Sequence, residues 1–265
     1  MAEVRARDGI RLHVEVDGDG LPVTVFAHGL TNSCTELAAF TPAAPGTKIR
    51  FCFRGHGHSD VAEPGSYRFE DFAGDVDAVA RAYGATQAVG TSLGAGAITH
   101  LLGADPERFE RLVFVLPAAL DRPLTSTQHA DFERTAELLE SLPADEAIER
   151  ILEGSGRAAD YEERPWLRDI DLLLWQDLNP TGVARAIREV TRDVAIADRS
   201  LLRRVRAPTL VIAREGDAIH PAELARVLVD LMPKAELIML ASEQELLEAI
   251  PTLVGRVSDF LGGTA

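Results

Sequence analysis

Residues 88–96 read Ala-Val-Gly-Thr-Ser-Leu-Gly-Ala-Gly, and this stretch decides how the rest of the chain is interpreted. Its centre is a G-x-S-x-G pentad around Ser92, with an apolar run before it and a helix-compatible run after it. This pattern is typical of a nucleophile elbow, a sharp strand-to-helix turn that exposes a serine hydroxyl. Glycines permit such a turn because they carry no Cβ atom. The alternative is a Gly-Ser turn that only joins a strand to a helix.

Apolar runs on both sides of this stretch predict a sheet of about eight strands. The expected strands cover residues 4–7, 11–16, 23–27, 49–53, 112–116, 208–213 and 235–240, together with the run that leads into Ser92. Asp8-Gly9 suits a tight hairpin turn between the first two strands. The later runs are continuously apolar, which is typical of parallel strands buried on both faces. Apolar residues recur at helical spacing over residues 69–83, so strands and helices alternate and a doubly wound α/β fold is expected.

The pattern changes between residues 118 and 206, where we find no convincing strand but several helical stripes. These stripes cover residues 132–142, 145–152, 166–178 and 183–194, and Pro143, Pro165 and Pro180 are typical helix-start signals. We therefore predict an α/β core formed by residues 1–117 and 207–265. Residues 118–206, called the helical segment below, are predicted to be an inserted cap or lid. Its apolar residues 172–175 are expected either to cover a pocket or simply to pack on the core.

Composition restricts the class of partner. The 265 residues carry a net charge of -15, which argues against nucleic acid or an anionic membrane surface as a partner. No apolar stretch is long enough to span a bilayer, and no apolar run follows the charges at the start of the sequence, so we expect a cytoplasmic protein. Cys34 and Cys52 are too few for a disulfide framework and are expected to be reduced. We expect no cofactor and no metal, and the sequence does not indicate an oligomeric state.

Four motifs then occur along the chain in a characteristic order. They are His28-Gly29, Arg54-Gly55-His56-Gly57-His58-Ser59, the pentad at Ser92, and Gly216-Asp217-x-Ile219-x-Pro221. Together they resemble the motifs of the α/β-hydrolase fold superfamily, and the resemblance covers nearly the whole chain outside the helical segment. It implies that Ser92 is the nucleophile and Asp217 the acid of a catalytic triad. It also implies that the backbone N–H groups of Leu30 and Leu93 form an oxyanion hole.

The sequence departs from this family where the triad histidine is expected. The family places that histidine between the last strand and the final helix. Here the corresponding residues read Leu240-Ala241-Ser242-Glu243-Gln244-Glu245, and no histidine follows His220. The pattern Ser242-x-x-Glu245 is instead typical of a capping box at a helix start. In a second departure, Cys52 stands where relatives commonly have an aspartate, and a buried cysteine there serves as a small hydrophobic residue.

Two residues are candidates for the missing base. His220 lies three positions after Asp217 in the same predicted loop, and its alternative role is to cap the helix that begins near Pro221. Glu243 is a possible acid or base if it shares a proton with Asp217, and its alternative role is a favourable charge at a helix start. His28 and His56 are expected to be structural, because they belong to the backbone turns.

Two classes of function remain open from the sequence. The first is a serine hydrolase-like enzyme with an atypical base, which acts on a small apolar ester, thioester or lactone held under the lid. The second is a non-hydrolytic protein of the same fold, either a ligand-binding protein, a lyase or a cyclase. Retention of Ser92 and Asp217 favours the first class, whereas the missing histidine favours the second.

Overall fold

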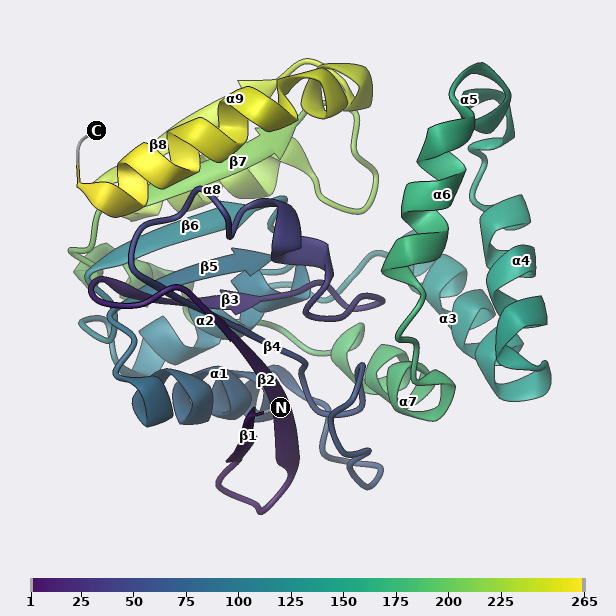
Figure 1. Ribbon diagram of the computed structural model, residues 1–265, viewed down its shortest axis with the longest axis horizontal. Coiled ribbons are helices and arrows are strands. Elements are labelled where there is room, and N and C mark those ends of the chain that lie inside the picture. Colours follow the sequence, from purple (N-terminus) through teal and green to yellow (C-terminus); the bar gives the residue numbers. More distant parts are fainter. Residues whose placement is uncertain (1, 264–265) are drawn as a thin grey trace.

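The computed structural model describes residues 2–263, which contain an eight-stranded sheet (Figure 1). In sheet order the strands are β1 (Ala2–Arg5), β2 (Arg11–Asp17), β4 (Thr47–Phe51), β3 (Val23–Ala27), β5 (Gln87–Thr91), β6 (Arg111–Val115), β7 (Thr209–Arg214) and β8 (Ala235–Leu240). β1 pairs antiparallel with β2, β2 pairs antiparallel with β4, and all later neighbours are parallel. The predicted doubly wound, mostly parallel sheet is therefore confirmed.

Helices cover both faces of the sheet, because the central strands are apolar on both sides. Neighbouring residues of β5 show this: Ala88 belongs to one hydrophobic core and Val89 to the other. The first core includes residues of α1, α2 and α8, and the second includes residues of α9 and of the short helix η1. Their bounds are α1 (Phe69–Tyr83), α2 (Leu93–Ala104), α8 (Ala222–Leu231), α9 (Glu243–Gly262) and η1 (Glu36–Ala39).

The helical segment contains five α-helices that follow β6 in the chain and precede β7. They are α3 (Ser126–Ser141), α4 (Ala144–Gly154), α5 (Ala158–Glu163), α6 (Pro165–Leu174) and α7 (Pro180–Val190), followed by the 3-10 helix η2 (Arg199–Arg204). Figure 1 shows α3 to α6 standing together beside the sheet. Pro165 and Pro180 each occupy the first helical position, as expected, and Pro143 is the N-cap of α4. The short helix α5 was not expected from the apolar pattern.

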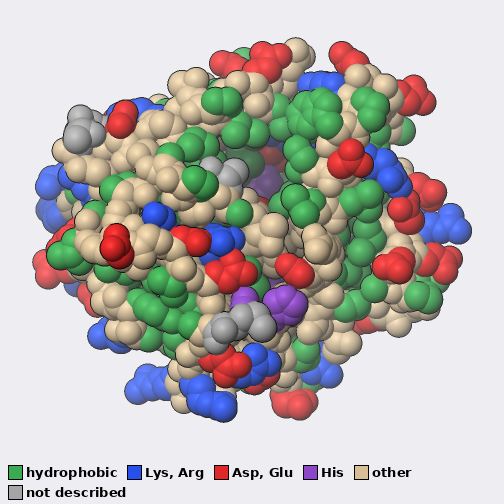
Figure 2. Space-filling model, in the orientation of Figure 1, with side chains coloured by type: hydrophobic (Ala, Val, Ile, Leu, Met, Phe, Trp, Pro, Cys, Tyr) green, Lys and Arg blue, Asp and Glu red, His purple; other side chains and the backbone are tan. Residues whose placement is uncertain are grey.

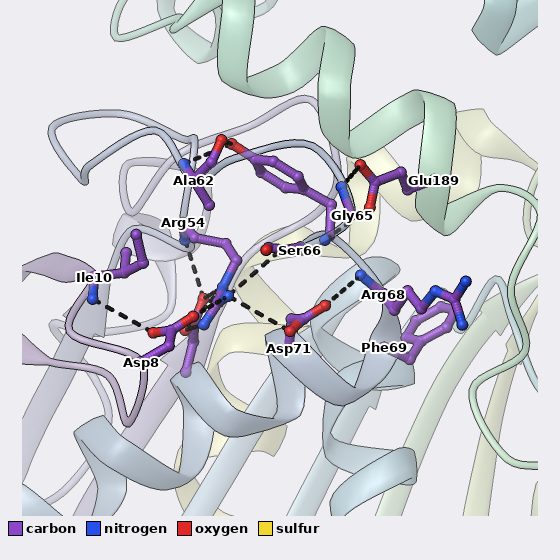
Figure 3. A network of polar contacts seen from close by, with 12 residues as sticks. Asp8, Ile10, Arg54, Ala62, Gly65, Ser66, Arg68, Phe69, Asp71 and Glu189 are labelled. Carbon is purple, nitrogen blue, oxygen red and sulfur yellow. Dashed lines mark hydrogen bonds and ion pairs between the residues drawn. The ribbon is translucent and has the colours of Figure 1, made fainter.

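A buried ionic network fixes the turn after β4 against α1 (Figure 3). The guanidinium of Arg54 donates to both carboxylate oxygens of Asp75, with the shortest N–O distance at 2.7 Å, and its Nη1 lies 2.8 Å from Asp8 Oδ2. Nearby, the carboxylate of Glu189 on α7 accepts hydrogen bonds from the backbone N–H groups of Gly65 and Tyr67 at 2.6 and 3.0 Å. The loop between β4 and α1 is thus bonded both to the core and to the helical segment.

The surface is predominantly acidic, as the net charge requires. Figure 2 shows acidic side chains spread over the face that carries the helical segment, and a histidine side chain is visible in a hollow of that face. Within residues 2–263, none of the helices combines the length and the apolar character that crossing a bilayer would need.

Candidate active site

Ser92 occupies the turn between β5 and α2 in a strained backbone conformation. Its φ is +48° and its ψ is -106°, a combination that non-glycine residues rarely adopt. The turn is held by the Ser92 N–H, which donates to the carbonyl of Val115 at 3.0 Å. A Cβ atom at Gly94 would lie 2.1 Å from the carbonyl oxygen of Ala27, the last residue of β3, so α2 can approach β3 this closely only with glycine. The strand, turn and helix expected around Ser92 are all present.

His220 lies between Ser92 and Asp217. Its Nε2 atom is 3.1 Å from Ser92 Oγ, and its Nδ1 atom is 3.1 Å from Asp217 Oδ2. Both distances are within hydrogen-bonding range. The structure thus brings together three of the residues singled out from the sequence, although Ser92 is more than a hundred positions from the other two.

The conformation of the loop between β7 and α8 allows the imidazole of His220 to contact Asp217, which lies only three residues earlier. Asp217 Oδ1 accepts hydrogen bonds from the backbone N–H groups of Ile219 and His220 at 2.9 and 3.0 Å. An aspartate that bonds the backbone two and three residues ahead folds the chain into a compact turn. Pro221 then follows as the N-cap of α8. One carboxylate therefore shapes the loop and orients the ring that the loop carries.

Asp217 is held as an anion. Burial acts to raise its pKa, but hydrogen bonds from His220 and the nearby charge of Arg214 outweigh this effect and lower the pKa to about 2. The Nη2 atom of Arg214 lies 3.0 Å from Asp217 Oδ2, and the Asp217 side chain is only 6% exposed. Arg214 was missed in the sequence, although its position three residues before the acid, at the end of β7, was a usable signal.

Glu243 contacts two guanidinium groups. Its carboxylate lies 3.0 Å from Arg157 Nη2 and 3.8 Å from Nη2 of Arg214, the same atom that contacts Asp217. The Arg214 guanidinium therefore lies close to both carboxylates. Glu243 is the first residue of α9, whose N-cap Ser242 accepts from the N–H of Glu245 at 3.2 Å.

Leu30, in the turn after β3, lines the same cavity as Ser92. Within residues 2–263, the N–H groups of Leu30 and Leu93 donate to no protein acceptor, and both residues line a cavity with Ser92. Glu36, which the sequence did not single out, anchors the turn: its carboxylate accepts from Gly29 N–H at 2.7 Å and from Asn32 Nδ2 at 2.6 Å. Desolvation raises the pKa of Glu36 to about 7, although these hydrogen bonds oppose the shift.

Two histidines of the motifs contact backbone atoms, as expected for structural residues. His28 Nε2 accepts from the N–H of Phe53 at 3.0 Å, and His28 Nδ1 lies 2.7 Å from the carbonyl oxygen of Gly29. His56 Nε2 lies 2.6 Å from the carbonyl oxygen of Leu30 and so helps to fix the turn that carries the Leu30 N–H.

The cavity over Ser92 is small and mainly apolar. It leaves about 40 Å³ in which the centre of a water-sized molecule can lie. Because one water needs about 10 to 15 Å³ of such space, there is room for only a few non-hydrogen atoms. Residues 172–175, expected either to cover a pocket or to pack on the core, are not among its lining residues, and Trp175 belongs to the hydrophobic core, against which Leu172 packs. The helical segment contributes Ala118, Ala119, Leu124, Phe132, Val190, Thr191 and Asp193, and the remaining apolar walls include Leu30, Phe69, Leu93 and Ile219.

Comparison with known proteins agrees with this architecture. A family described as alpha/beta hydrolase fold matches residues 49–246. None of the curated proteins compared with the sequence matches it.

Solved structures match over almost the full chain. A hydrolase from Pseudomonas aeruginosa PA01 is 26% identical, with a TM-score of 0.79 and 98% of each chain covered. The enol-lactonase from Burkholderia xenovorans LB400 is 21% identical, with a TM-score of 0.81 and coverage of 98% of this chain and 100% of the other. An esterase from Rhodococcus sp. ECU1013 is 22% identical, with a TM-score of 0.78 and coverage of 100% and 99%.

Proposed function

Because the chain belongs to the alpha/beta hydrolase fold family, we propose that it is a serine hydrolase in which Ser92 is the nucleophile, His220 the base and Asp217 the acid. The observation that carries this proposal is the position of the His220 ring, with one nitrogen 3.1 Å from Ser92 Oγ and the other 3.1 Å from Asp217 Oδ2. A serine hydroxyl becomes an effective nucleophile only when an adjacent base accepts its proton.

The proposed reaction has two steps. Ser92 Oγ attacks the carbonyl carbon of the substrate while its proton moves to His220 Nε2, which then donates the proton to the departing alcohol oxygen. Water next gives a proton to the same nitrogen, attacks the acyl group and releases the acid, and Ser92 recovers its proton. Asp217 stays ionised and stabilises the imidazolium that forms. The N–H groups of Leu30 and Leu93 stabilise the negative oxygen of each tetrahedral intermediate.

In this proposal the base comes from an unusual point in the chain, because the histidine follows the acid within one loop. A triad is defined by geometry and roles and not by sequence position, so this order is compatible with the chemistry. Glu243, close to the place in the chain where the family carries its histidine, serves instead in an ionic contact with Arg157 and Arg214.

We propose a small ester or lactone as the substrate class, with the helical segment as a cap over it. The restricted apolar cavity above Ser92 supports a short acyl group. The activities named for the similar structures, a hydrolase, an enol-lactonase and an esterase, favour the same class. A thioester remains within this class because its carbonyl is attacked in the same way.

The test compares nitrophenyl acetate with nitrophenyl octanoate and adds labelling by a fluorophosphonate. We expect saturable hydrolysis of the acetate, weaker hydrolysis of the octanoate, and a stoichiometric adduct on Ser92. Ser92→Ala should abolish labelling and reduce turnover by roughly 10⁶-fold where the full triad operates. Ser141→Ala, an exposed serine of α3, is the matched control and should change neither. A folded protein that neither turns over these esters nor labels would overturn the proposal and favour the non-hydrolytic class.

A further inference from the structure

A second group of reactive side chains lies on β2 and in the segments that follow β3 and β4. His13 and Glu15 are two residues apart on β2, and alternate residues of a strand share one face of the sheet. Possible ligand atoms of His13, Glu15 and Cys34 all lie within 4.8 Å of one another. Cys52 supplies a second sulfur beside this group: its backbone N–H donates to the His13 carbonyl at 3.0 Å, and its side chain interacts with that of Cys34.

The donors in this group are mostly buried, with an opening on one side. His13 and Cys34 are each 3% exposed, and Cys52 is fully buried. The side chain of Glu15 is 39% exposed, so an ion can reach the group from solvent along this side chain. Because His13, Cys34 and Cys52 are shielded from water, the ligands of a bound ion would be mainly protein atoms.

The spacing of two donors is already close to that of a tetrahedral metal site. His13 Nε2 and Glu15 Oε1 are 3.5 Å apart. Bonds of about 2.0 Å from zinc to nitrogen and to oxygen give a tetrahedral edge of about 3.3 Å. The sulfur of Cys34 lies within 4.8 Å of both atoms, so a movement of at most about an ångström completes such a site. Side-chain rotation in a loop residue can supply that movement.

We propose that His13, Glu15, Cys34 and Cys52 form a binding site for Zn²⁺. Thiolate and imidazole donors select zinc over Mg²⁺ and Ca²⁺, which prefer oxygen ligands. Binding releases the two thiol protons to solvent and forms two zinc–sulfur bonds, without any change in oxidation state. Arg50 Nη2 lies 2.8 Å from Glu15 Oε2 and 2.9 Å from Asp17 Oδ2, so its positive charge is shared between two carboxylates. Zn²⁺ offsets most of the negative charge of the two thiolates and of Glu15.

A bound zinc ion would connect the turn that follows β3 to two other segments of the chain. Cys34 lies four residues after Leu30 in the segment between β3 and η1, whereas His13 and Cys52 belong to β2 and to the residue after β4. A metal bound by all of them joins three separate segments of the chain. Zinc should therefore stabilise the folded protein, because an ion that binds only the folded state raises its stability.

The alternative is that these contacts are complete without an ion. In that case His13 and Glu15 are only a hydrogen-bonded pair, Glu15 is an ion-pair partner of Arg50, and the two cysteines are small apolar residues. The chain offers a matched control for this case: His129 Nε2 and Glu133 Oε1 are 3.4 Å apart and belong to a His–Glu pair on α3.

The test uses the full chain after removal of metals with a chelator and reduction of the thiols. We expect the protein to bind about one Zn²⁺ ion per chain in equilibrium dialysis and to melt several degrees higher with Zn²⁺. Co²⁺ in place of Zn²⁺ should give the near-ultraviolet absorption band of a cobalt–thiolate bond. Cys34→Ser should remove about half of this band, because one of the two thiolates is lost, and Glu15→Gln should weaken binding at least about tenfold.

Two variants separate the zinc site from general effects. His129→Gln and Ser92→Ala should bind Zn²⁺ as the parent does. Equal binding by the parent and by Cys34→Ser, or bound Co²⁺ without a thiolate band, would overturn the proposal. If Cys34→Ser fails to fold, Glu15→Gln decides the question, because Glu15 is half-exposed and its replacement leaves the buried donors in place.

Discussion

His220 follows Asp217 by three residues in one loop, and its Nδ1 atom lies 3.1 Å from the Asp217 carboxylate. The pairing of these two residues is therefore local, because the turn made by Asp217 with the backbone N–H groups of Ile219 and His220 already folds the ring back. The tertiary fold has only to bring Ser92 to the other side of the imidazole. Such a local pair needs no contribution from the loop between β8 and α9.

Replacement of His220 tests its role as the base. His220→Gln and His220→Ala should each lower ester turnover at least about 100-fold, because the Ser92 proton loses its acceptor. Their melting temperatures should stay close to that of the parent. His100→Gln, which alters a histidine bonded to the Ala195 carbonyl, should leave turnover unchanged. Unchanged kinetics in the His220 variants, measured with nitrophenyl acetate, would remove His220 from the mechanism.

Asp217→Asn should lower ester turnover and should also change how the free energy of unfolding depends on pH below about pH 4. The amide cannot stabilise an imidazolium, and turnover is expected to fall by roughly 10⁴-fold as in a comparable triad. The pKa of Asp217 is lowered to about 2, so its ionised form stabilises the folded state above an unfolded pKa of about 3.9. This contribution is lost as the pH falls toward 2. Urea unfolding should show a difference between parent and variant that is largest above pH 4 and narrows below it; a constant difference would contradict the assignment.

The sequence predicted the sheet well, because buried parallel strands leave continuous apolar runs and the Ser92 turn requires glycines. Ionic contacts between segments far apart in the chain leave no comparable pattern in the sequence. Glu243 was considered either as an acid or base or as a charge at a helix start, but its contact with Arg157 was not foreseen, because Arg157 comes from the helical segment and nothing local links the two positions. The spacing of His220 from Asp217 made it a candidate only. The hydrogen bonds of Asp217 to the backbone, which put the ring in place, depend on a turn geometry that residue types alone do not specify.

Glu36→Gln should change how stability depends on pH. The pKa of Glu36 is raised from about 4.5 to about 7, so the folded state favours the neutral carboxyl. A raised carboxyl pKa gives a contribution to stability that is complete below the unfolded value and is lost as the pH rises toward 7. Glutamine stays neutral, so the melting temperature of the variant should fall less than that of the parent between pH 5 and 8. Parallel curves for the two proteins would show that Glu36 does not titrate in this range.

Asp75→Asn should strongly destabilise the protein, because it leaves the buried guanidinium of Arg54 without its main counter-charge. Both side chains are almost inaccessible to solvent, and breaking such a pair typically costs about 3 to 5 kcal/mol. The matched control is Asp71→Asn, whose carboxylate is partly exposed and lies 3.6 Å from the same guanidinium (Figure 3). It should cost about 1 kcal/mol or less. Urea unfolding measures both, and similar losses would contradict the importance assigned to the buried contact.

Glu243→Gln decides between the two roles considered for this residue. In the structure its carboxylate joins Arg157 of the helical segment to Arg214 of the core, and its side chain is 42% exposed. An exposed contact of this kind is worth about 0.2 to 1 kcal/mol, so the variant should lose little stability and should keep its turnover within a few-fold of the parent. A double-mutant cycle with Arg157→Gln should give a coupling energy in the same range, smaller at high salt. If Glu243 instead transfers protons in the reaction, turnover of nitrophenyl acetate should fall at least about 100-fold with no coupling to Arg157.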